Sequence, residues 1–215
     1  MNKSLIICAG LGSTGTSALD NALGILGFTT AKWTHVTEQP SQKHIPSMIM
    51  KPLMHGRYVK GMFDHVDAIL DSPAIDHLPW ILDDYPHSKI ILTVRDPRKW
   101  ALRRFLLHPC SSPPFFTWYE PYKSKCTRTP PYVLEHSYLA WYAYVQTLCR
   151  ERNLKVLILN LFEEDDQQLW KRLAEFLGVN TKQFRGKFGK RKRALPLTAQ
   201  SQFHSHQNDN HLFSM

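Results

Sequence analysis

Residues 10–17 constrain the fold of this 215-residue chain more than any other segment. They read G-L-G-S-T-G-T-S, and they stand between the apolar run Ser4–Ala9 and the segment Thr16–Leu26, whose apolar residues recur at the spacing of one helix face. A buried strand that turns through glycines into a helix directs several backbone N–H groups, and the positive end of the helix dipole, at one point. The segment therefore predicts a turn that holds the phosphate of a nucleotide-like ligand.

The turn departs from two common nucleotide-binding patterns. The P-loop of nucleoside triphosphatases ends in G-K-[ST], whereas Gly15 is followed here by Thr16 and Ser17 without a lysine. The glycine spacing fits G-x-G-x-x-G, but no acidic residue ends a clear second strand about 20 residues later, as a dinucleotide fold requires. A magnesium-dependent triphosphatase or kinase is therefore disfavoured. We expect six residues to hold the phosphate: Gly12, Ser13, Thr14, Gly15, Thr16 and Ser17.

Further strands and helices alternate along the chain. Short apolar runs predict buried strands at Val66–Leu70, Lys89–Val94 and Lys155–Leu159. Helical spacing and end signals predict further helices at His77–Tyr85, Pro97–Leu107, Tyr132–Arg152 and Asp165–Leu177. This alternation predicts an α/β fold, a three-layer sandwich around a central parallel sheet of about four or five strands.

The remaining segments complete the expected organisation. Residues 29–60 and 109–131 show no regular pattern, so we expect irregular loops there. Residues 1–193 are predicted to form a single domain, and the polar residues 194–215 a flexible tail.

Two motifs together resemble the PAPS-dependent sulfotransferases. The first is Gly10–Leu19, G-L-G-S-T-G-T-S-A-L, and the second runs from Asp71 to Trp100, with D-S-P-A followed by Y-P-H-S-K-I-I-L-T-V-R-D-P-R-K-W. One branch of that family carries similar motifs in the same order, and the resemblance extends over about residues 3–179. It implies the P-loop-like sulfotransferase fold and 3′-phosphoadenosine-5′-phosphosulfate (PAPS) as donor. It also implies adenosine 3′,5′-bisphosphate as product and a small-molecule or carbohydrate acceptor.

The resemblance also implies roles for basic residues. Arg95 matches the arginine that pairs with the 3′-phosphate, while the loop 12–17 holds the 5′-phosphosulfate. Arg103 stands where the family has a phosphate-binding serine, and we expect it to hold the same phosphate. Arg185 and Gly186 begin a stretch similar to the family's late basic G-x-x-G loop, which closes over the 3′-phosphate.

One departure from the family keeps alternatives open. Ser13 stands where the family often has a lysine or arginine that steadies charge on the leaving phosphate. Either another basic residue supplies that charge, or activity is weak or absent. The alternatives to a sulfotransferase are a P-loop small-molecule kinase and a catalytically impaired, sulfotransferase-like binding protein.

Sulfuryl transfer to a hydroxyl or amine needs a group that takes up the acceptor's proton. Asp71 is the preferred base because it ends a predicted strand next to the motif, although it could instead cap the turn at Ser72-Pro73. His35 is the second candidate, since related sequences often have a histidine in this region. No metal is expected, because hydrogen bonds and cations can carry the developing charge.

Charge and cysteine content add expectations about partners and location. The net charge is +9, and seven of the twelve residues 182–193 are Lys or Arg. This cluster suits an anionic ligand and leaves nucleic acid open as a less expected partner. Four widely spaced cysteines without a C-x-x-C predict free thiols and a cytoplasmic protein. No apolar run reaches the roughly 18 residues of a membrane span, so none is expected.

Overall fold

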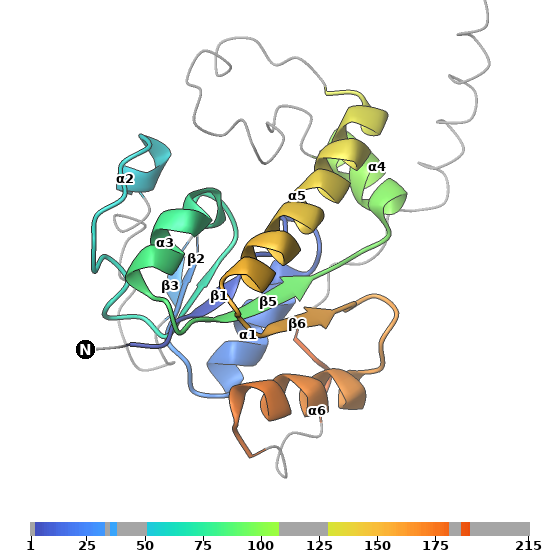
Figure 1. Ribbon diagram of the computed structural model, residues 1–215. Helices are drawn as coiled ribbons and strands as arrows, with labels where there is room; N and C mark the ends of the chain where they lie inside the picture. Colours follow the sequence, from blue (N-terminus) through green and yellow to red (C-terminus); the bar gives the residue numbers. More distant parts are fainter. Residues whose placement is uncertain (1–2, 33–34, 38–50, 108–128, 181–185, 190–215) are drawn as a thin grey trace, which may run out of the picture.

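The structure, a computed structural model, describes residues 3–32, 35–37, 51–107, 129–180 and 186–189 (Figure 1). Its described strands form one six-stranded sheet in the order β3-β2-β4-β1-β5-β6. Their bounds are β1 Ile6–Cys8, β2 Thr30–Lys32, β3 His35–Thr37, β4 Ala68–Leu70, β5 Lys89–Thr93 and β6 Val156–Leu159. Five of these strands pair in parallel, and β3 pairs antiparallel with β2 at one edge.

The described helices cover both faces of the sheet. Their bounds are α1 Thr16–Ile25, α2 Lys51–Met54, α3 Leu78–Asp84, α4 Pro97–Leu107, α5 Pro131–Glu151 and α6 Asp166–Leu177. One apolar core joins the sheet to α3, α4 and α5, and a second joins it to α1 and α6. Figure 1 shows α3 and α5 on one side of the sheet and α6 on the other.

Alternation along the short strands feeds both cores. In β1, Ile7 belongs to the core under α3 and α5, whereas its neighbours Ile6 and Cys8 belong to the core under α1 and α6. Successive side chains of a strand point to opposite faces, and a strand covered on both faces is therefore apolar throughout. The predicted α/β sandwich with a parallel central sheet is confirmed.

Most predicted elements are found within one or two residues of their expected ends. α4 begins and ends where the sequence predicts, because Asp96 caps it: its Oδ1 accepts from the backbone N–H of Lys99 at 2.7 Å. Asp165 caps α6 in the same way through the N–H of Gln167, and Gly178 ends that helix with φ 78°.

The expectation for residues 29–60 was wrong. This segment contains β2, β3 and α2. Each of these strands has only three residues, too few for alternation to stand out, and β2 is recognised by its pairing with β4. The sheet gains from them one parallel strand and one antiparallel edge strand.

Several expectations lie outside the described residues. These are the tail 194–215 and most of the loop 109–131, so the division into a domain and a tail stays a prediction. In the part of the chain that the structure describes, no helix is long and apolar enough to cross a membrane.

Candidate functional site

The glycine-rich turn runs from the carboxyl end of β1 into α1. Ser13 and Gly15 adopt positive φ angles of 74° and 105°. The Thr14 backbone N–H donates to the Leu11 carbonyl at 3.1 Å, and the Thr14 hydroxyl donates to the same oxygen at 2.6 Å. The turn therefore fixes its own shape before any ligand binds, and it leaves the first amides of α1 at its mouth.

Side chains from other elements anchor this turn. Trp100 on α4 donates from Nε1 to the Gly12 carbonyl at 2.8 Å, and the Leu11 N–H donates to the hydroxyl of Tyr142 at 3.3 Å. The Thr93 hydroxyl lies 2.7 Å from that of Thr14, and both side chains are buried. This anchoring holds the backbone amides of the turn in one geometry. Ligand binding therefore costs little conformational entropy, because the turn is already ordered.

Gly10 permits the closest of these contacts. A Cβ atom at this position would lie 2.1 Å from Thr93 Oγ1 and 2.8 Å from the Thr93 backbone. Only a glycine lets the turn approach β5 so closely. Gly10, the first glycine of the motif, thus places the turn against the neighbouring strand.

Arg95 flanks the turn on the β5 side. Its guanidinium Nη1 donates to the Ser13 carbonyl at 3.4 Å, and its Cζ lies 4.3 Å from the ring centre of Phe162. Its backbone N–H donates to the Tyr138 hydroxyl at 2.9 Å, and that hydroxyl donates to the Arg95 carbonyl at 2.8 Å. Burial and the nearby Arg103 lower the pKa of Arg95, which as a guanidinium nevertheless stays charged near neutral pH.

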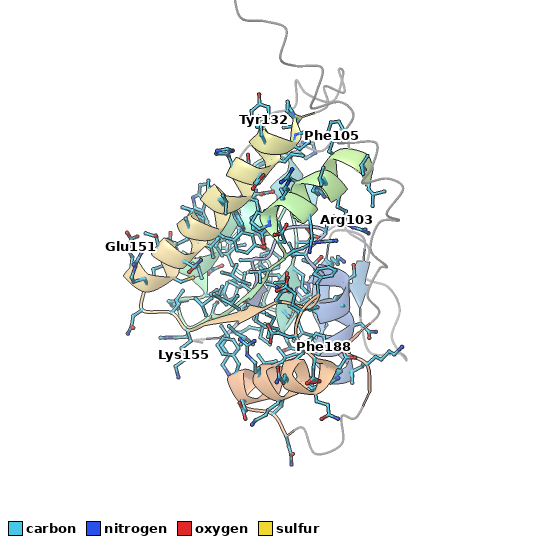
Figure 2. The ribbon with its side chains drawn as sticks, turned by 90° about the vertical axis from the view of Figure 1, so that its right-hand side faces the viewer. Arg103, Phe105, Tyr132, Glu151, Lys155 and Phe188 are labelled. Carbon is cyan, nitrogen blue, oxygen red and sulfur yellow. The ribbon has the colours of Figure 1, made fainter. Side chains whose placement is uncertain are left out.

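Arg103 adds to the positive charge on this side. It is a buried residue of α4, labelled in Figure 2. Two partly buried guanidinium groups repel each other, and an anion bound beside them would reduce that repulsion. The charge of Arg103 thus acts on Arg95, the other residue predicted to hold the 3′-phosphate.

Asp71 flanks the turn on the opposite side, directly after β4. Its Oδ2 accepts from the Thr16 hydroxyl at 3.1 Å, and its Oδ1 accepts from the Ser72 backbone N–H at 3.0 Å. The second bond is the turn-capping contact foreseen as the alternative role, and the first brings the carboxylate to the predicted phosphate loop. The two contacts coexist in one conformation.

Gly12 leaves room for a charged pair beside the turn. A Cβ atom there would lie 3.2 Å from Asp71 Oδ1 and 3.3 Å from Nη1 of Arg104. Burial lowers the pKa of Arg104, and the charge of Asp71 opposes that change. Arg104 was not predicted as a site residue, because α4 carries four basic residues and the sequence does not separate their directions.

Backbone strain is concentrated at the same place. Among the described residues, three other than glycine have positive φ angles: Ser13, Asp71 and Asn153. Such a conformation costs about 1–3 kcal/mol and persists where the surroundings impose it, often at functional sites. Of these three residues, Ser13 belongs to the turn and Asp71 contacts it through Thr16.

Lys32, the last residue of β2, is the second residue that the sequence analysis missed. Its ammonium group donates to the Ser17 hydroxyl at 2.5 Å, and the residue is only 7% exposed. It lies in the segment expected to be irregular, where no pattern indicated a strand that ends at the loop.

The remaining predicted residues are placed only in part. His35 belongs to β3, where its backbone pairs with Lys32, but its side chain and all of Arg185 lie outside the described structure. The Gly186 carbonyl accepts from Trp170 Nε1 at 3.0 Å. The ring of Phe188, labelled in Figure 2, is tilted by 55° to that of Trp170, with the ring centres 4.8 Å apart. Gly189 packs so tightly on α1 that a Cβ would lie 2.3 Å from the carbonyl oxygen of Ala18. Within the described residues 186–189, Gly189 therefore lies against the first turn of α1.

No group of three or more His, Cys, Asp or Glu residues in the described segments could hold a metal ion. The site's charged groups are instead one carboxylate and several cations around a helix N-terminus. This arrangement can bind an anionic ligand and offers one base for a proton.

Comparison with known proteins gives one family model and several solved structures that are similar to the chain. No curated protein matches the chain significantly. Solved structures that match include a sulfotransferase from Alicyclobacillus acidocaldarius, which is 19% identical over 97% of this chain and 93% of that chain, with a TM-score of 0.49. A family model, that of the sulfotransferase domain, matches residues 5–103, a stretch that includes the turn, Asp71, Arg95 and Arg103. The match to this family model covers 99 of the 215 residues of the chain.

Proposed function

We propose that the chain is a PAPS-dependent sulfotransferase, which moves a sulfuryl group from PAPS to a hydroxyl or amine of a small-molecule or carbohydrate acceptor. One observation carries the proposal: Arg95 reaches the predicted phosphosulfate loop, with its Nη1 3.4 Å from the Ser13 carbonyl. The contact joins two motifs that are 82 positions apart in the sequence. A ligand that spans both would need one phosphate group at each end, as PAPS has.

The described residues fit such a ligand. The amides at the N-terminus of α1 and the hydroxyls of Thr16 and Ser17 suit the 5′-phosphosulfate. Arg95 and Arg103 suit the 3′-phosphate, since guanidinium groups bind phosphate through two parallel hydrogen bonds. When bound, PAPS supplies the activated sulfuryl group.

The chemistry assigned to the chain is proton uptake and charge stabilisation. Asp71, or else His35, takes the proton of the acceptor while the acceptor oxygen or nitrogen bonds to sulfur and the bond from sulfur to the phosphate oxygen breaks. The electron pair of that bond leaves with adenosine 3′,5′-bisphosphate. Loop N–H groups and nearby cations stabilise the charge that develops there.

A thermal-shift titration tests the proposal. Adenosine 3′,5′-bisphosphate should raise the melting temperature, because a ligand that binds only the folded state stabilises it. Arg95→Ala should abolish most of that rise, with Arg150→Ala, an exposed residue of α5, as the control. No rise with millimolar bisphosphate would overturn the proposal, and a rise only with ATP and magnesium would favour the kinase.

A second assay separates an enzyme from a binding protein. Ser13 is the observation that favours the binding protein, because it leaves position 13 without a charge. Transfer of labelled sulfuryl from PAPS to a panel of phenols, alcohols, amines and sugars should yield product. A protein that binds the bisphosphate but sulfates none of these acceptors would fit the impaired alternative.

We also propose a cytoplasmic location. Cys8 and Cys149 are free thiols in the described structure, and both are buried. Burial raises the pKa of the Cys8 thiol to about 12, so this group is expected to be inert to oxidation and alkylation. The basic residues 182–193 would also suit nucleic acid, a less expected partner than a small-molecule or carbohydrate acceptor.

A further inference from the structure

We propose that Lys32 binds the 5′-phosphosulfate, and that its ammonium group takes the place beside Ser17 that a magnesium ion takes in P-loop triphosphatases. The inference rests on the proposed function, and it adds Lys32 to the residues that bind the ligand. The consequence is that ligand binding at the loop needs no metal ion.

The first argument is the burial of the charge. Lys32 is 7% exposed, and lysines are almost never so buried unless they are paired. Among the described residues its ammonium group has one hydrogen-bond partner, the neutral hydroxyl of Ser17, and no ion pair. A buried charge with only a neutral partner is costly, and an anion beside it would remove most of that cost.

The second argument is the direction of the side chain. Lys32 pairs in register with Leu70, and Leu70 with Cys8, so the three residues lie in one row across the carboxyl ends of β2, β4 and β1. Leu70 and Cys8 belong to the core under α1, and the contact with Ser17 sends the lysine to that same side. Lys32 therefore reaches the N-terminus of α1 from the sheet, where an anion at the loop would be bound.

The third argument is the position of its partner. In the P-loop motif the hydroxyl that follows G-K binds Mg²⁺, and Ser17 stands at that position after Gly15 and Thr16. A metal ion and the Lys32 ammonium group could not both sit 2.5 Å from this hydroxyl. The positive charge of Lys32 thus takes the place of the positive charge that a magnesium ion provides in P-loop triphosphatases.

Ser17 does not use all the donors of the ammonium group, and no other acceptor contacts it among the described residues. It carries three N–H donors, and Ser17 accepts one of them. The other two could reach ligand oxygens at the loop. Lys32 thus offers the charge that position 13 lacks, delivered from β2 instead of from within the turn.

Calorimetric titration of Lys32→Met tests the inference. The probes are adenosine 3′,5′-bisphosphate and adenosine 3′-monophosphate, which differ only in the 5′-phosphate. We expect affinity for the bisphosphate to fall about 10- to 100-fold, the effect of losing one charged hydrogen bond, and affinity for the 3′-monophosphate to stay the same. Lys89→Met is the control, because Lys89 donates to a backbone carbonyl, that of Leu177, away from the loop.

Stability separates a binding role from a structural one. Since the buried charge is costly without a ligand, Lys32→Met should not lower the melting temperature of the ligand-free protein. Lys32→Gln is the second variant, because it keeps a donor for Ser17 but has no charge, and it should lose the same affinity. Bisphosphate affinity in either folded variant equal to that of the wild type would overturn the inference.

The metal prediction and the proposed function fail in different ways. Wild-type affinity for the bisphosphate should be the same in EDTA and in millimolar Mg²⁺, and a requirement for Mg²⁺ would overturn the inference alone. If the wild type binds no bisphosphate under any condition, the proposed function fails instead.

Discussion

The two strands beside β1 are followed by residues of opposite charge. Asp71 directly follows β4 and Arg95 follows the end of β5, while the glycine-rich turn follows β1 between them. Each contacts the turn, Asp71 through the Thr16 hydroxyl and Arg95 through the Ser13 carbonyl. The sheet order alone thus places a carboxylate on one flank of the turn and a guanidinium on the other.

This difference in charge assigns ligand binding and catalysis to different flanks. The Arg95 flank is cationic, also through Arg103, and it suits an end of the ligand that does not react. The Asp71 flank combines a carboxylate with the cations Lys32 and Arg104, and it suits the end where a proton leaves and a charge develops. Changes on the first flank should therefore alter binding, and changes on the second should alter turnover. At Lys32 a change should also lower the affinity for the 5′-phosphate.

The largest effect is expected from Asp71→Asn. An asparagine keeps the shape, still accepts from Thr16 and tolerates the φ of 69°, but it cannot take up a proton. We expect kcat for sulfuryl transfer to fall about 10²- to 10⁴-fold. Bisphosphate affinity should hold or improve, because a negative charge near the anionic ligand is lost.

The matched control for this variant is Asp67→Asn. Asp67 precedes the same strand at its other end, where it accepts from the Thr29 N–H at 2.8 Å. Its replacement should leave kcat unchanged. If Asp71→Asn keeps kcat within about tenfold of the wild type, the carboxylate is not the base and His35 becomes the candidate.

The two flanks also differ in how far the sequence predicts them. Arg95 follows a five-residue apolar strand and precedes a helix with an Asp cap, so both the element and its end are visible in the sequence. Lys32 ends a three-residue strand whose formation depends on pairing with β4, a long-range contact that local patterns do not encode. The turn, Asp71 and Arg95 could thus be foreseen, whereas the cations of the Asp71 flank could not.

A smaller effect is expected when a charge is added to the turn itself. If Lys32 already provides the cation for the leaving phosphate, Ser13→Lys in the wild type should raise kcat less than about tenfold. In the Lys32→Met background the same change should restore a larger share of the lost turnover. The measurement is a double-mutant cycle on kcat, with Ser13→Met as the uncharged control of similar length.

The opposite pattern would contradict this account. A rise in kcat of about 100-fold or more in the wild type would mean that no other residue serves as the cation of the turn. Equal gains in both backgrounds would mean that positions 13 and 32 act independently.

The smallest effect is expected from Thr93→Val, which belongs to neither flank. The Thr93 hydroxyl lies against that of Thr14 at 2.7 Å and holds the turn to β5. Valine fills the same volume, and Thr14 keeps its bond to the Leu11 carbonyl, so unfolding by urea should show a loss of only about 1 kcal/mol. Because Asp71 and Arg95 both contact the turn, a small shift of the turn should affect both ends of the ligand. Affinities for adenosine 3′-monophosphate and for adenosine 5′-monophosphate should therefore weaken together, each by less than about fivefold. A loss of affinity for only one of the two nucleotides would mean that the turn does not couple the two flanks. The positions of Asp71 and Arg95 would then depend on β4 and β5 alone.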